Sequence, residues 1–208
     1  MKASDIRSHF GSVSQASPIY RHIGDVRNVP VKGVKTPGLK FKPSICRLCN
    51  NARTQAHDRA WESLSRALRS LTSPLRKRQR IDLKAILGDD FARLMANVHL
   101  YFVKALGCYA VEHRVPLPLK SMAVAIRNGT PHPHIYLTFA AIESNRDKKH
   151  VYVGNVKAAM QRDALKGATW FYILGELGVL VTYSEMGRPA ERSSTWHPGD
   201  DVPNLNLA

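Results

Sequence analysis

Cysteine, acidic residues and long apolar runs are scarce in this chain of 208 residues. Three cysteines are an odd and sparse count, which argues against a secreted disulfide framework and favours a reducing, cytoplasmic environment. No segment approaches the roughly 18 apolar residues of a membrane helix, and residues 1–15 are too polar for a signal peptide. We therefore expect a cytoplasmic protein without a membrane partner.

The shortage of acidic residues is concentrated in the first part of the chain. The sequence has 31 Lys and Arg against 16 Asp and Glu, which gives a formal net charge of +15. Residues 1–84 hold 18 of these basic residues and only 5 of the acidic ones. A positive field attracts polyanions, and Lys and Arg that contact phosphates release counterions. The asymmetry predicts a nucleic acid partner, in the first place DNA; a protein partner with an acidic surface is the alternative.

The apolar periodicity predicts an α+β fold in three parts. Residues 1–84 form a basic module of knuckle and helix, residues 85–186 a module of helix and sheet, and residues 187–208 a loosely ordered tail. In the second module, apolar residues from 91 to 109 predict a helix that is buried on several sides. Runs rich in β-branched and aromatic residues at 134–142, 151–156, 169–174 and 179–183 predict a small, mostly antiparallel sheet packed against this helix.

The basic module has one clear helix, which the apolar spacing of residues 57–71 predicts. Before it, residues 26–42 are either short edge strands or a basic arm that becomes ordered on a partner. After it, residues 75–80 (LRKRQR) are either a solvated turn or a patch that contacts phosphate. The candidate phosphate contacts in the module are Arg47, Arg53, Arg59, Arg66, Arg69, Arg76, Lys77, Arg78 and Arg80.

Cys46 and Cys49 form a C-x-x-C pair just before this helix. Two thiolates in such a turn reach adjacent corners of a tetrahedral zinc site, and His57 is the candidate third ligand. The ligand set is incomplete, so a structural Zn²⁺ is one hypothesis for the knuckle. Helix capping by Asn50 and Asn51 is the other, because asparagine side chains accept hydrogen bonds from the first backbone amides of a helix.

Residues 46–62, CRLCNNARTQAHDRAWE, resemble the second half of a treble-clef HNH-type module. They are also similar to the C-N-N-x-R/K-T-Q-x-x-D run of bacterial and prophage-borne proteins of that kind. The resemblance implies a metal-dependent DNA endonuclease, in which Mg²⁺ or Mn²⁺ holds the scissile phosphate and a histidine activates water. By position, Asn50 or Asn51 matches the helix-borne residue of the site. The first half of the pattern is missing, and His22, with His9 behind it, is the substitute for the base.

Three functions follow from these patterns. The first is nucleic-acid binding by a degenerate HNH-like knuckle whose arginines contact phosphates. The second is metal-dependent cleavage of DNA, and the third is a structural or protein-interaction role with an acidic partner.

Overall fold

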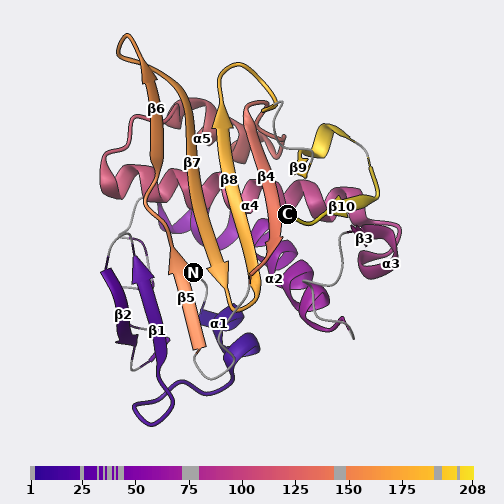
Figure 1. The fold of residues 1–208 in the computed structure, drawn as a ribbon. Helices are drawn as coiled ribbons and strands as arrows, with labels where there is room; N and C mark the ends of the chain where they lie inside the picture. Colours follow the sequence, from indigo (N-terminus) through magenta and orange to yellow (C-terminus); the bar gives the residue numbers. More distant parts are fainter. Residues whose placement is uncertain are drawn as a thin grey trace.

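The computed structural model describes residues 3–23, 26–31, 33–34, 36, 39, 41, 45–71, 80–142, 149–189, 194–200 and 202–208. These residues form a layer of β-strands with helices packed behind it (Figure 1). The predicted α+β class is confirmed, because a buried helix packs on a mostly antiparallel sheet.

The main sheet has eight strands in the order β2-β1-β5-β7-β8-β4-β9, and β6 also pairs with β7. Neighbouring strands are antiparallel, except that β1 and β5 are parallel. A separate two-stranded sheet pairs β3 with β10. The strands are β1 Ile19–Ile23, β2 Val26–Val31, β3 Arg80–Asp82, β4 Ile135–Ala141, β5 Lys149–Val153, β6 Lys157–Gln161, β7 Ala164–Leu174, β8 Leu177–Ser184, β9 Thr195–Trp196 and β10 Asn204–Asn206.

Tight turns join the long strands of the sheet. Arg162 and Asp163 have φ values of 47° and 63°, and this pair of left-handed residues makes the two-residue turn between β6 and β7. Gly175, with φ of 61°, begins the turn between β7 and β8. These turns match the twist of the flanking strands, so β7 and β8 pair along eight consecutive positions from Gly167 to Leu174.

The α-helices of the described residues are α1 Ala3–Phe10, α2 Gln55–Arg69, α3 Leu83–Leu87, α4 Phe91–His113 and α5 Leu119–Asn128. The central one is α4, which runs behind the sheet with α2 and α5 on either side of it (Figure 1). Because α4 is apolar around most of its circumference, Val98, Phe102 and Leu106 are almost completely buried. Among the described helices, only α4 is long and apolar enough to cross a membrane, and 67% of its most apolar window is buried inside the protein.

One hydrophobic core contains residues from both predicted modules. Trp61 of α2 is fully buried between α4 and the sheet. Its ring centroid lies 4.8 Å from that of Phe102 on α4 and 5.7 Å from that of Tyr172 on β7. The parallel pairing of β1 with β5 also joins the two parts in one sheet. The division at residue 84 therefore stays a prediction about folding units, and the two units share their core.

The predicted tail also contains regular structure. Within residues 187–208, β9 pairs with β4 and β10 pairs with β3, and a 3-10 turn, η4 (Pro198–Asp200), lies between them. Leu205 is fully buried, and Trp196 is 6% exposed. These two side chains anchor the end of the chain on the core.

Candidate nucleic-acid interface

The knuckle is a compact turn at the start of α2. The backbone N–H of Cys49 donates a hydrogen bond to Cys46 Sγ at 3.3 Å, and this bond lowers the pKa of the Cys46 thiol. Cys49–Arg53 then form a π-helical turn, η2, which leads through Thr54 into α2. Asn50 and Asn51 are exposed on η2, and Thr54, not either asparagine, occupies the N-cap position of α2.

The structure brings together two of the three predicted zinc ligands. Cys46 and Cys49 adjoin each other, whereas His57 is buried and its Nδ1 lies 2.8 Å from Asn97 Oδ1 on α4. Among the described residues, no group of three or more His, Cys, Asp or Glu could hold a metal ion. Two thiolates alone do not make the four-ligand set of a structural zinc site, so the described ligands do not fit one.

The predicted catalytic histidines lie on separate elements. His9 is on α1, where its ring lies against Gly175 of the β7–β8 turn, and burial, with Arg69 nearby, lowers its pKa to about 4. His22 is on β1, with Nε2 2.8 Å from His150 Nδ1 and Nδ1 accepting the Asn28 N–H at 3.3 Å. Both ring nitrogens of His22 are thus engaged, and burial, with His150 and Arg27 nearby, lowers its pKa.

The inward side of α2 carries one cluster that joins it to α1. Asp5 of α1 is 1% exposed and accepts hydrogen bonds from Trp61 Nε1 at 3.0 Å and from Ser65 Oγ at 2.9 Å. Arg69 completes the cluster with a salt bridge of 3.2 Å to Asp5. Burial raises the pKa of Asp5, while Arg69 and the three hydrogen bonds oppose the rise. Arg69, a predicted phosphate contact, is therefore engaged inside the protein.

A second cluster joins α2 to α4. Lys104, in the middle of α4, is 8% exposed and forms a salt bridge with Asp58 of α2. Lys104 Nζ also donates to Thr54 Oγ1 at 3.1 Å, so the ammonium group fixes the residue that begins α2. Because Thr54 directly follows the knuckle, this contact holds the knuckle against α4. The salt bridge and the hydrogen bond also stabilise the buried charge of Lys104.

The outward side of the knuckle and α2 carries arginines that are exposed to solvent. Arg47, Arg53, Arg59 and Arg66 are all exposed, and none of them forms a salt bridge within the described part of the chain. Arg59 and Arg66 are seven residues apart, which places them on the same face of α2. We call these four side chains the arginine face.

The remaining predicted contacts follow α2 in the sequence. Arg80 is exposed at the start of β3. Arg76, Lys77 and Arg78 lie outside the described residues.

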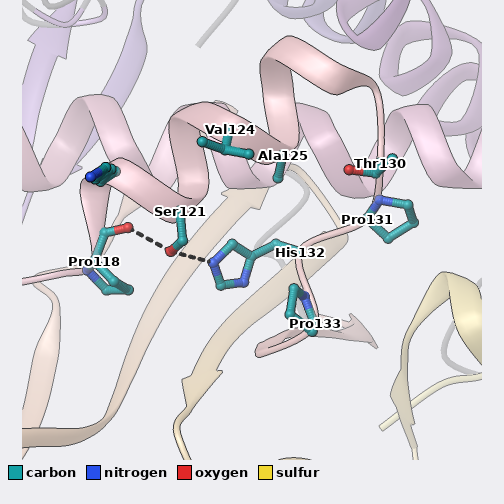
Figure 2. Close-up of a pocket in the computed structure, with 9 residues that line it drawn as sticks. Pro118, Ser121, Val124, Ala125, Thr130, Pro131, His132 and Pro133 are labelled. Atoms are coloured by element: carbon teal, nitrogen blue, oxygen red, sulfur yellow. Dashed lines mark hydrogen bonds between the residues drawn. The ribbon is translucent and has the colours of Figure 1, made fainter.

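A pocket of about 560 Å³ lies where α5 meets the start of β4. Figure 2 shows Ser121 and His132 pointing toward one another in it, with Ser121 Oγ 2.9 Å from His132 Nε2. His132 Nδ1 accepts the His134 N–H at 3.3 Å, so the ring proton is on Nε2 and points at the serine. Ser121 donates its own proton to the Pro118 carbonyl at 2.9 Å. This polarity is opposite to that of a nucleophile and its base.

Sequence reasoning missed His150, Lys104 and the Ser121–His132 pair. His22 meets His150 only because β1 pairs in parallel with a strand about 130 residues later. Lys104 lies inside an apolar run, and a buried lysine there is itself a signal that a carboxylate must face it. No residue spacing in the sequence indicates the pocket.

Comparisons of the chain with family models, curated proteins and solved structures find no match. The function proposed below therefore depends on the residues and their geometry.

Proposed function

We propose that this protein binds nucleic acid, and that the arginine face contacts the phosphates. The observation that carries the proposal is that the cations on the inward side of α2 form salt bridges and those on its outward side do not. The inward cations, Arg69 and Lys104, are neutralised by Asp5 and Asp58, whereas the four outward arginines have no ionic partner in the described residues. Exposed guanidinium groups without a carboxylate partner suit phosphate oxygens, which they bind through two parallel hydrogen bonds.

The shape of the surface supports the same ligand. The arginine face extends from the knuckle along α2, and Lys104, Asp58 and Thr54 hold the knuckle in place. Arginines on a backbone that is held in place can meet phosphates without ordering that backbone on binding. Cleavage of DNA has no comparable support, because no hydrogen bond among the described residues joins His9 or His22 to Asn50 or Asn51.

The test is the affinity of a fluorescently labelled duplex DNA for an Arg59→Ala/Arg66→Ala double variant. We expect the variant to bind about 10-fold more weakly at low salt, because each lost phosphate contact also reduces counterion release. Both side chains are exposed, so the free energy of unfolding changes by less than about 1 kcal/mol.

A matched control removes the same charge elsewhere. Lys120 and Arg127 are exposed on α5, and Figure 1 shows α5 on the opposite side of α4 from α2. A Lys120→Ala/Arg127→Ala variant has the same net charge as the test variant and is expected to bind within about 2-fold of the wild type. Equal losses in the two variants would mean that net charge, not the arginine face, determines binding.

A further inference from the structure

The face of the sheet opposite α2, α4 and α5 carries aromatic rings on neighbouring strands. No described helix covers this face, and in Figure 1 it is turned toward the reader. Side chains alternate along a strand, so the neighbours of the buried Ile19, Val151 and Tyr172 point outward. These outward side chains are Tyr20 and His22 on β1, His150 and Tyr152 on β5, and Phe171 on β7, which we call the ring face.

The rings of β1 and β5 lie side by side because the two strands pair in parallel. Tyr20 is opposite His150 and His22 is opposite Tyr152 in the register. The ring centroids of His22 and His150 are 5.0 Å apart, those of Tyr20 and His150 5.9 Å, and those of His22 and Tyr152 6.3 Å. The four side chains are only half-buried, so part of each ring is open to solvent.

A glycine separates Tyr152 from the fifth ring, Phe171, which is 41% exposed. A Cβ atom at Gly154 would lie 3.2 Å from Phe171 Cβ and 3.2 Å from Tyr152 Cε1. The absence of a side chain at this buried glycine therefore lets the Tyr152 ring and Phe171 pack closely over its backbone. The glycine thus brings the rings of β5 and β7 together on the outward face.

The charged side chains described beside the rings are basic. Arg27 of β2 lies over the Tyr152 ring at 5.0 Å from its centroid. Lys157 of β6 is exposed and opposite Thr169, two positions from Phe171. The eight described strands of the main sheet contain no Asp or Glu. An acidic polymer can therefore approach the rings without meeting a like charge within these strands.

We propose that the ring face stacks unpaired bases of a single-stranded nucleic acid, with Arg27 and Lys157 at its phosphates. Every base has a π face, so a row of exposed rings beside cations binds single strands with little dependence on sequence. A duplex hides its bases between the strands and does not fit this surface. The inference rests on the proposed function for its ligand class, but it uses a different surface and a different kind of contact.

The test measures the binding of a labelled oligothymidylate of about 15 nucleotides, a length in the range that one such surface covers. We expect Tyr152→Ala and Phe171→Ala each to weaken binding by about 5-fold or more. The ring-retaining variants Tyr152→Phe and Phe171→Tyr are expected to bind like the wild type. An oligomer of equal length with abasic sugars keeps the phosphates, and its weaker binding is expected to be unaffected by the alanine variants.

The proposal fails if the folded alanine variants bind oligothymidylate as the wild type does, or if the abasic oligomer binds equally well. It also fails if these variants change only self-association, measured by sedimentation, because the face would then be a contact between copies of the chain. The arginine face is tested separately by Arg59→Ala/Arg66→Ala. If that variant binds with wild-type affinity while the ring variants bind more weakly, the phosphate contacts of the arginine face are contradicted. The proposal for the ring face then still holds.

Discussion

At the scale of single residues, Asp5 connects the two N-terminal helices through one buried carboxylate. It accepts hydrogen bonds from Trp61, Ser65 and Arg69, which are spaced along the inward side of α2. Four-residue spacing puts these three donors on one helical face, so a single acceptor on α1 can satisfy all of them. The carboxylate therefore determines how α1 lies on α2.

We predict that Asp5→Ala lowers the free energy of unfolding by about 3 kcal/mol or more, because it leaves the Arg69 charge and the Trp61 N–H without their acceptor. Urea unfolding measures the change. Asp89→Ala is the control, since Asp89 has a side chain that is 90% exposed and pairs only with Lys84 in the described structure. Asp89→Ala is expected to lower the free energy of unfolding by less than about 0.5 kcal/mol. Similar losses in both variants would show that the Asp5 cluster does not stabilise the fold.

Two buried histidines, His99 and His132, and the half-buried His9 make the stability of the fold depend on pH. Burial lowers the pKa of His99 to about 3 and that of His132 to about 4, and neighbouring histidines add to both effects. Burial likewise lowers the pKa of His9 to about 4. Since the ordinary value is 6.5, these side chains take up protons in the unfolded chain before they do so in the folded one. Their contribution to stability is full above pH 6.5 and is lost as the pH falls toward 4.

His132→Gln tests this linkage at one site. The glutamine keeps an N–H donor for Ser121 but does not titrate, so the variant is expected to lose less stability than the wild type between pH 7 and pH 5. The expected difference is roughly 2 kcal/mol, from the interval between pH 6.5 and pH 5. Urea unfolding at the two pH values measures it. Parallel pH dependence in the two proteins would mean that His132 is protonated equally in the folded and unfolded states.

At the scale of elements, α1 is held against the sheet as well as against α2. The His9 ring occupies the space in front of Gly175, where a Cβ atom would overlap it. Gly175 also has a positive φ of 61°, which starts the turn between β7 and β8. The same glycine thus permits the turn and leaves room for α1.

We predict that Gly175→Ala is more destabilising than Gly187→Ala. Both residues have positive φ, which costs an L-residue about 1–2 kcal/mol, but a Cβ at Gly187 meets no atom within 4 Å. In a His9→Ala background the extra cost of Gly175→Ala is expected to disappear. Thermal or urea unfolding of the wild type, Gly175→Ala, His9→Ala and the double variant measures the coupling, and Gly187→Ala is measured beside them. An undiminished cost in the His9→Ala background would show that His9 does not determine the effect.

The elements that could be predicted from the sequence are those with a local pattern. The apolar circumference of α4 indicated a buried helix, and the runs rich in β-branched and aromatic residues indicated β4, β7 and β8. β1 was not predicted, because Ile19–Ile23 follow a loop rich in serine and glycine and pair with a strand far along the chain. The partner strand of β1 lies so far along the chain that no local pattern near Ile19–Ile23 indicates the pairing.

In the candidate site, too, only the features with a local sequence pattern could be predicted. The exposed positions of Arg59 and Arg66 follow from the helical period of α2. The engagement of Arg69 by Asp5 does not, since it requires the placement of α1. Local periodicity gives the face of a helix, whereas a partner from another element appears only in the folded chain.

At the scale of the whole molecule, the sheet separates two positively charged surfaces. The arginine face belongs to the helical layer behind the sheet, and the ring face lies on the open side (Figure 1). We propose the first as a site for phosphates of any strand and the second as a site for unpaired bases. A net charge of +15 favours approach of nucleic acid to either surface.

The salt dependence of wild-type binding to duplex DNA tests the central claim most directly. Four phosphate contacts by the arginine face predict that the logarithm of the association constant falls with the logarithm of salt concentration with a slope of about −3 to −4. Phosphate contacts by further cations would make this slope steeper. Absence of binding at low salt, or a slope shallower than about −1, would contradict nucleic-acid binding through the arginine face.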